Sequence, residues 1–300
     1  MTDSTGKQTV WITGSSGFLG NRLVRYFSSQ GAFVVGFSRR GCEADHSVMV
    51  DLSSHAAVAR LQQVIADGLA PDVIIHAASK QPGNGKDAEF VFANVYTTQR
   101  LLEAIGDRPP QKLIYTSTQS VYQRPASLPV YEDAPAGGAM PYSATKRWSE
   151  QLLESMADVS EVTVLRLPSL YGAGQADSFV DGLAQTALRD APLELFSQGE
   201  LIRDALHVSD VVKAVGACVS RPVERGYTVM NLGCGRPIKT LEYAEALVSS
   251  LGSASAIVPV DRKASQVDLY ANIERARRLI GFAPMTLDES MTEYANELRA

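Results

Sequence analysis

The stretch TGSSGFLG, residues Thr13–Gly20, decides the fold. It joins an apolar run over Thr9–Ile12, which predicts a strand, to an amphipathic run over Phe18–Ser29, which predicts a helix. Its glycines are spaced G-x-x-G-x-x-G, so the backbone can turn tightly and approach a pyrophosphate, which the helix N-terminus also attracts. We therefore expect a dinucleotide-binding loop, the alternative being an ordinary strand-to-helix turn. The residues expected to contact the cofactor here are Gly14, Ser16, Gly17, Phe18, Leu19 and Gly20.

Short apolar runs alternate with amphipathic runs through the first two thirds of the chain, and after Pro168 the pattern loosens. Strands that are apolar on both faces, separated by helices, predict a parallel sheet covered on both sides with right-handed connections. We expect strands over residues 33–37, 47–50, 73–77, 112–117 and 162–167, and helices over 54–67, 88–105 and 142–157. The expected fold is α/β, with a doubly wound parallel Rossmann sheet over residues 1–168 and a smaller C-terminal α+β substrate lobe over residues 169–300. Segments near 205–235 are expected to return to the sheet.

Composition excludes several classes of function. With 28 basic and 33 acidic residues the net charge is -5, so no basic field is present to attract nucleic acid or anionic lipid. The three cysteines, Cys42, Cys218 and Cys234, never form a CxxC pair, which argues against a disulfide framework or a metal site. We expect no signal peptide, since the start is polar, and no apolar run reaches the roughly 18 residues of a membrane span. A cytoplasmic protein is the expectation.

The end of the second expected strand bears on the choice of cofactor. An acidic residue there accepts hydrogen bonds from the ribose hydroxyls of NAD, whereas an arginine accommodates the 2′-phosphate of NADP. This chain has Ser38, Arg39 and Arg40 at that place, and the first acid is Glu43. NADP(H) is therefore favoured, and NAD(H) is the alternative. The two arginines could also belong to a solvated loop that has no part in cofactor binding. Asp51, after the third strand, is expected to accept from an adenine amino group or to cap the next helix.

Tyr142 and Lys146 form Y-x-x-x-K at the start of an expected helix. The i, i+4 spacing places both on one helical face, where the ammonium could lower the pKa of the phenol from its usual value near 10. A phenol tuned in this way can exchange a proton with an alcohol or ketone. The spacing alone is a weak signal, but it follows Thr118 at the carboxyl end of a strand, where ligands of open α/β sheets bind. We predict a catalytic group of Thr118, Tyr142 and Lys146.

These motifs together resemble the extended short-chain dehydrogenase/reductase family, in particular its sugar-nucleotide epimerases, dehydratases and reductases. The resemblance covers nearly the whole chain, including Asp51-Leu52, His76-Ala77-Ala78, Arg203–Asp210 and Asn231-Leu232-Gly233. It implies that Tyr142 is the acid/base, that Lys146 assists it and binds the nicotinamide ribose, and that Thr118 bonds the reacting oxygen. It also implies further cofactor contacts from Leu52, Ala77, Ala78 and Asn94. Contacts to the substrate are implied for Ser169, Arg203 and Arg262.

Two departures from the family pattern shape the functional expectation. The 4,6-dehydratases carry acids directly after the catalytic Thr, where this chain has Gln119 and Ser120, so dehydratase activity is not expected. Many members have Asn at the position of Ser169, which leaves the pose of the substrate open. Our first hypothesis is an NADPH-dependent reductase of a 4-keto-6-deoxy sugar nucleotide, and the alternative is an NAD-dependent UDP-hexose 4-epimerase. A non-sugar carbonyl substrate and a non-catalytic dinucleotide sensor are the remaining options. The resemblance also implies a homodimer paired through the helices over 88–105 and 142–157.

Overall fold

The first described element, β1 (Thr9–Thr13), belongs to a seven-stranded sheet. The computed structural model describes residues 6–81, 87–122, 125–137, 140–175, 178–263 and 267–300. The other strands of this sheet are β2 (Phe33–Ser38), β3 (His46–Met49), β4 (Val73–His76), β5 (Lys112–Thr118), β6 (Glu161–Leu167) and β10 (Gly226–Asn231). Their order is β10-β6-β5-β4-β1-β2-β3, and the four neighbouring pairs from β3 to β5 are parallel. This order confirms the predicted doubly wound sheet, with its switch point between β1 and β4.

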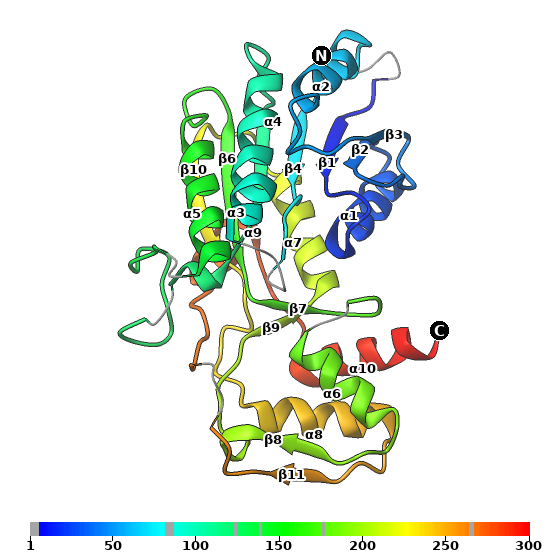
Figure 1. Cartoon of the computed structure of the whole chain (residues 1–300), viewed down its shortest axis with the longest axis vertical. Coiled ribbons are helices and arrows are strands. Elements are labelled where there is room, and N and C mark those ends of the chain that lie inside the picture. The colour runs from blue at the N-terminus through cyan, green and yellow to red at the C-terminus, as the bar shows by residue number, and fades with distance from the viewer. Residues whose placement is uncertain (1–5, 82–86, 123–124, 138–139, 176–177, 264–266) are drawn as a thin grey trace. The chain divides into compact units, whose positions relative to one another are not determined.

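The helices associated with this sheet follow the predicted apolar stripes. They are α1 (Phe18–Ser29), α2 (Ala57–Ala66), α3 (Asp87–Phe90), α4 (Thr97–Ile105), α5 (Pro141–Glu154) and α7 (Val208–Ser220). Leu61 of α2, Leu101 of α4 and Leu153 of α5 share one buried cluster with Trp11 and Tyr115 of the sheet. Helices α4 and α5 therefore run side by side on one face of the sheet, as Figure 1 shows.

One expected helix is irregular. Residues 88–105 were expected to form a single α-helix, but a π-helical segment, η1 (Val91–Tyr96), separates α3 from α4. The wider turn leaves backbone groups outside the usual i→i−4 pattern, and the carbonyl of Asn94 accepts from the hydroxyls of Thr98 and Ser149. Residue spacing in the sequence does not show such an insertion, because every residue of η1 except Asn94 is apolar or aromatic and the segment has no distinct apolar face.

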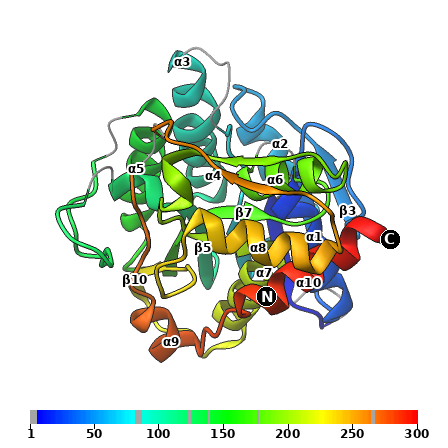
Figure 2. The same cartoon turned by 90° about the horizontal axis from the view of Figure 1, so that it is seen from below.

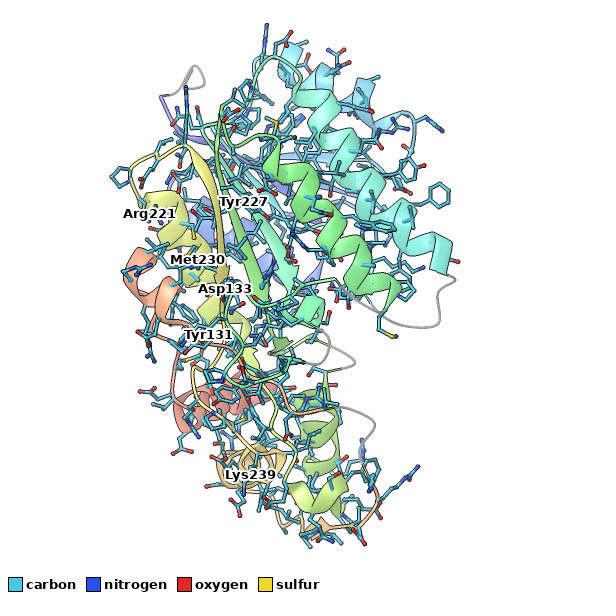
Figure 3. All side chains as sticks on the ribbon, turned by 90° about the vertical axis from the view of Figure 1, so that its left-hand side faces the viewer. Tyr131, Asp133, Arg221, Tyr227, Met230 and Lys239 are labelled. Carbon is cyan, nitrogen blue, oxygen red and sulfur yellow. The ribbon has the colours of Figure 1, made fainter. Side chains whose placement is uncertain are left out.

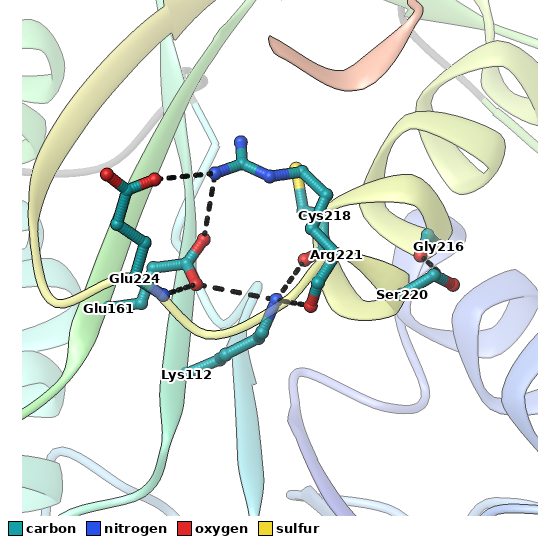
Figure 4. A network of polar contacts seen from close by, with 7 residues as sticks. All are labelled: Lys112, Glu161, Gly216, Cys218, Ser220, Arg221 and Glu224. Carbon is teal, nitrogen blue, oxygen red and sulfur yellow. Dashed lines mark hydrogen bonds and ion pairs between the residues drawn. The ribbon is translucent and has the colours of Figure 1, made fainter.

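The amino ends of β5 and β6 hold a buried ion-pair network (Figure 4). The Nζ atom of Lys112, whose side chain is 3% exposed, donates to the carbonyls of Cys218 at 2.8 Å and Arg221 at 2.6 Å. It also lies 3.4 Å from a carboxylate oxygen of Glu161. The ammonium thus satisfies carbonyls at the C-terminal end of α7, which a helix leaves without partners of its own.

The chain forms two compact units, whose segments alternate along the sequence. Unit 1 comprises Met1–Gln123, Ala136–Arg166 and Val212–Met230, and unit 2 comprises Arg124–Pro135, Leu167–Val211 and Asn231–Ala300. The predicted assignment of cofactor binding to residues 1–168 and of substrate binding to residues 169–300 stays a prediction. Within the described part of the chain, no helix is both long and apolar enough to span a membrane.

Unit 2 combines short strands with helices. Its elements are β7 (Ser169–Tyr171), α6 (Phe179–Ala187), β8 (Leu193–Leu195), η3 (Phe196–Gly199), β9 (Ala205–His207), α8 (Thr240–Leu251), β11 (Ile257–Pro259), α9 (Glu274–Ile280) and α10 (Leu287–Arg299). Strand β7 pairs with β9, and β8 pairs with β11. Helices α8 and α10 lie side by side (Figure 2) over a core that includes Tyr171, Tyr243 and Tyr294. A capping box between Thr286 and Glu289 opens α10.

Candidate active site

The loop between β1 and α1 is built around three close backbone approaches. Gly14 has φ +70°, and its amide donates to the carbonyl of Phe37 at 2.8 Å. A Cβ on Gly14 would lie 2.9 Å from the backbone of Ala78, and a Cβ on Gly20 would collide with the carbonyl of Gly14. Gly14 is therefore required both by space and by conformation, and Gly20 is required by space.

This loop fits the pyrophosphate of a dinucleotide. The buried hydroxyl of Ser15 has no hydrogen-bond partner among the described residues. Gly17 is the N-cap of α1 and provides no side-chain cap, so the first amides of α1 are left for a ligand. An anion at this place would satisfy these donors and interact favourably with the helix dipole. Of the other residues predicted to contact the cofactor, Ser16 lies in this loop, and Phe18 and Leu19 are the first two residues of α1.

Other predicted cofactor residues follow the carboxyl ends of neighbouring strands. Ala77 and Ala78 come directly after β4, and the amide of Ala78 donates to Thr13 Oγ1 at 3.1 Å. Leu52 is buried in the core that covers the sheet. Asp51 is exposed and uses Oδ1 to accept from the amide of Ser53 at 3.0 Å, so it closes a local turn. Asp51 does not cap α2, which excludes one of its two expected roles.

The end of β2 presents positive charge. Arg39 and Arg40 are exposed, and neither takes part in an ion pair within the ranges that the structure describes. The hydroxyl of Ser38 donates to the carbonyl of Arg40. The nearest acid in sequence, Glu43, is bound by Arg25 at 3.3 Å.

The three predicted catalytic residues all belong to unit 1. Thr118 ends β5, and Tyr142 and Lys146 lie one turn apart at the start of α5. Lys146 is 1% exposed, and its Nζ donates to the carbonyl of Thr116 at 2.6 Å and lies 4.2 Å above the ring of Tyr115. The hydroxyl of Tyr142 is half-buried and donates to Gln81 Oε1 at 3.4 Å.

The electrostatics of this group differ from the sequence-based expectation. Burial raises the pKa of Tyr142 to about 12, although hydrogen bonds with Ser79, Gln81 and Thr118 oppose the increase. Burial also lowers the pKa of Lys146 to about 7, with Glu150 opposing that change. The expected lowering of the phenol pKa by Lys146 is therefore absent here. The ammonium points to a backbone carbonyl and an aromatic ring, and desolvation dominates both groups.

His76 is a packed, neutral side chain. It is fully buried, with Nδ1 2.7 Å from Thr13 Oγ1 and Nε2 2.9 Å from Thr98 Oγ1. Burial, and secondarily the charge of Lys146, lowers the pKa of His76 to about 3. Asn94 is also buried, and its amide links the amide of Lys80 to the hydroxyl of Thr145. The Asn94 side chain therefore connects the loop after β4 to α5. The predicted contact between Asn94 and the cofactor stays a prediction.

The predicted substrate residues all belong to unit 2. Ser169 begins β7 and lies opposite Ala205 in the pairing with β9. Arg203 comes two residues earlier and is half-buried, with its guanidinium 4.7 Å above the ring of Phe179. Burial lowers the pKa of Arg203, and no carboxylate pairs with it in the described residues.

Arg262 has a similar environment at the surface of unit 2. It is exposed, and its guanidinium lies 4.9 Å above the ring of Phe196. Stacking on an aromatic ring holds a guanidinium in place while its N–H groups remain available to an anion.

Sequence reasoning missed the polar groups next to Tyr142. Ser79 and Gln81 follow β4 and are hydrogen-bonding neighbours of the Tyr142 hydroxyl. Their place after a strand of the switch point could have indicated them, because ligands of open α/β sheets bind at that edge. Phe179 and Phe196, which support the two arginines, carry no such sequence signal, since each resembles an ordinary core residue.

A glycine loop at the switch point of a doubly wound sheet, with the Thr118–Tyr142–Lys146 group on β5 and α5, defines an enzyme of the extended short-chain dehydrogenase/reductase type. The chain belongs to the NAD dependent epimerase/dehydratase family, whose model matches residues 10–233.

Characterised relatives span nearly the whole chain. It is 27% identical over 312 residues to the UDP-glucose 4-epimerase of Azospirillum brasilense, covering 95% of this chain and 90% of that one. It is 25% identical over 313 residues to the UDP-glucuronate 4-epimerase of Thermodesulfobacterium geofontis, covering 95% and 94%. Among solved structures, MoeE5 in complex with UDP-glucose and NAD is similar with a TM-score of 0.82 and 28% identity, covering 97% and 98%.

Proposed function

We propose that this chain is a nucleotide-sugar 4-epimerase acting on a UDP-hexose or UDP-hexuronate. The observation that carries the proposal is the Tyr142–Lys146 pair on α5 together with Thr118 at the end of β5. The two residues after Thr118 are the neutral Gln119 and Ser120, where a dehydratase has acids. The relatives named above support the epimerase alternative better than the reductase that we first expected.

In this proposal Tyr142 moves a proton at the 4-hydroxyl of the sugar. When bound, the dinucleotide accepts and returns a hydride, so the substrate carbon is oxidised and then reduced. Tyr142 removes the hydroxyl proton in the first half of the cycle and returns it in the second. Thr118 bonds the same oxygen and fixes its position, and Lys146 supplies positive charge below the phenol.

The raised pKa of Tyr142 makes its proton transfer depend on added positive charge. A phenol with a pKa of about 12 is almost entirely protonated at neutral pH, so very little phenolate is present to accept a proton. Binding of the oxidised dinucleotide would bring a cationic ring to this region, which favours the phenolate by charge attraction. We therefore expect Tyr142 to act as a base only in the loaded enzyme.

Arg203 and Arg262 support a substrate that carries a diphosphate. Both guanidiniums stack on aromatic rings and are without carboxylate partners in the parts of the chain that are described. A half-buried cation without a partner is costly, and an anionic ligand would offset this cost for Arg203.

We propose NADP(H) as the preferred cofactor of this chain. Arg39 and Arg40 are exposed at the end of β2, and the acid nearest to them in the sequence, Glu43, is paired with Arg25. An epimerase returns the hydride to the same carbon, so the 2′-phosphate has no bearing on the balance of the reaction. Calorimetric titration with NADP⁺ and NAD⁺ tests this preference, and tighter binding of NAD⁺ refutes it.

The experiment that tests the function is incubation of the purified, cofactor-loaded protein with UDP-glucose and with UDP-glucuronate. We expect NMR to show the 4-epimer without net change in absorbance at 340 nm, and no product with Tyr142→Phe. The reductase remains the second candidate because Arg39 and Arg40 suit the NADPH pool. Stoichiometric loss of NADPH with a 4-keto sugar nucleotide, and no epimer from either hexose, favours the reductase instead.

We also propose a cytoplasmic homodimer. Phe92, which stacks on Tyr96 at 5.2 Å, and Trp148 are 56% and 50% exposed on the neighbouring η1 and α5 segments, as an interface requires. The three cysteines are free thiols, in keeping with a reducing compartment. Sedimentation should give a dimer for the wild type and a monomer for Phe92→Glu/Trp148→Glu, and a monomeric wild type refutes this proposal.

A further inference from the structure

A third polar side chain continues the face of α5 that carries the catalytic pair. Glu150 lies one turn after Lys146 and two turns after Tyr142, and it is fully buried. An ionised carboxylate in such a place is strongly destabilising unless other groups pair with it and donate hydrogen bonds to it. The partners of Glu150 therefore indicate what holds this part of α5.

The carboxylate of Glu150 joins α5 to two strands of the sheet. Arg166 of β6, itself 3% exposed, donates from Nε to Oε1 at 3.1 Å and from Nη2 to Oε2 at 2.8 Å. The hydroxyl of Ser117 on β5 donates to Oε1. Arg147 of α5 donates to Oε2 at 3.1 Å. The two-pronged bond from Arg166 fixes the orientation of the carboxylate as well as its position.

Strand β5 holds Lys146 and Glu150 with adjacent residues. The carbonyl of Thr116 accepts from Lys146 Nζ at 2.6 Å, and the next residue, Ser117, bonds Glu150. Helix α5 is therefore attached to β5 at two successive turns. A shift of Glu150 would move the preceding turn, which places the ammonium of Lys146.

We infer that Glu150 and Arg166 are positioning residues for Lys146: their buried ion pair fixes α5 on β5 and β6 and provides the negative charge that keeps Lys146 an ammonium. The inference rests on the proposed function, in which Lys146 supplies positive charge beneath Tyr142. Neither residue is assigned a contact with substrate or cofactor.

The electrostatic part of this inference has a defined sign. Burial lowers the pKa of Lys146 to about 7, and the charge of Glu150 is the interaction that opposes it. Loss of that charge leaves the guanidiniums of Arg166 and Arg147 facing the same region, so the pKa of Lys146 must fall further. Among the described residues, the titratable or charged groups near Lys146 or Glu150 include His76, Tyr115, Tyr142, Arg147, Arg166 and Tyr227. Tyr227, which is labelled in Figure 3, belongs to β10, and its hydroxyl interacts with the charge of Glu150.

The test compares Glu150→Gln with Glu154→Gln, which removes the same charge from an exposed position one turn further along α5. Dinucleotide affinity is measured by calorimetry, and kcat for epimerisation by NMR, across about pH 5.5 to 9. We expect the high-pH limb of both profiles to move to lower pH by about one unit in Glu150→Gln, and to stay in place in Glu154→Gln. The double variant Glu150→Gln/Arg166→Gln removes both members of the buried ion pair, so neither is left without the other, and it should show the same direction of shift if Glu150→Gln alone does not fold.

Two results overturn the inference. The first is a uniform loss of affinity and kcat at every pH with an unmoved midpoint, which is what a merely structural role produces. The second is a wild-type affinity that is independent of pH over the same range. If the wild type epimerises neither sugar nucleotide while its affinity profile still shifts in Glu150→Gln, the proposed function fails and the positioning role stands.

Discussion

Replacement of Lys112 by Met should destabilise the protein without affecting its dinucleotide site. Lys112 Nζ is the shared donor to the carbonyls of Cys218 and Arg221 (Figure 4). Methionine occupies the space of the lysine methylene groups but has no N–H group to donate to either carbonyl. Glu161 keeps Arg221 at 3.6 Å and the amide of Glu224 at 3.0 Å, so its carboxylate retains partners.

The size of the effect follows from the two carbonyls. A buried polar group without a partner costs about 1–3 kcal/mol, which gives about 2–6 kcal/mol for the pair. Removal of a buried ammonium offsets part of this cost, so we expect the free energy of unfolding to fall by about 3 kcal/mol. Urea unfolding followed by tryptophan fluorescence measures the change, and Lys213→Met, on the exposed side of α7, is the matched control.

Dinucleotide affinity is the second measurement on the same variant. Lys112 begins β5, at the edge of the sheet opposite to the end of β1 that leads into the phosphate loop. The dissociation constant should therefore change by less than about threefold. A stability loss below about 1 kcal/mol, or a tenfold weaker dinucleotide, refutes the reasoning.

Three further predictions concern the site. Because the pKa of His76 is lowered to about 3, only the unfolded chain binds its proton between about pH 6.5 and pH 3, so stability present above pH 6.5 falls by about 2 kcal/mol on acidification to pH 5. Urea midpoints should show a weaker pH dependence in His76→Gln, and an unchanged slope contradicts this assignment. Gly20→Ala places a methyl group against the carbonyl of Gly14 and should abolish measurable dinucleotide binding by calorimetry while the far-ultraviolet circular dichroism is kept. Arg203→Leu should raise the KM for the sugar nucleotide by about 10–100-fold with dinucleotide affinity unchanged, and equal KM values would remove Arg203 from the substrate site.

Spacing and periodicity were sufficient to predict the sheet and the glycine loop between β1 and α1. Both follow from local rules: Gly14 needs a positive φ, Gly20 needs backbone contact, and the strands must be apolar on both faces. The i, i+4 spacing likewise placed Tyr142 and Lys146 on one face of α5.

The chemical state of that pair could not be obtained from spacing. The environment of the Tyr142 hydroxyl includes Gln81, which reaches it from 61 residues away in the sequence. The environment of Lys146 depends on Tyr115 and on Glu150, whose own partner is on another strand. The π-helical segment at Asn94 was missed for a related reason, since Ser149, one of the two donors to its carbonyl, becomes a neighbour only when α5 packs against η1.

Buried polar groups at the amino ends of the strands have more complete sets of partners than those at the carboxyl ends. At the amino edge, Lys112 is matched by the carboxylate of Glu161 and by two carbonyls, so nothing remains for a ligand to complete. At the carboxyl edge, the hydroxyl of Ser15 has no partner among the described residues, and the partners that the described residues offer Lys146 are a carbonyl, a ring and the charge of Glu150. Incomplete matching lowers stability, and a bound anion or polar ligand restores it by mass action. Dinucleotide binding should therefore stabilise the protein most strongly at pH values where Lys146 is an ammonium. The pH dependence of dinucleotide affinity in Glu150→Gln tests the same charge on Lys146.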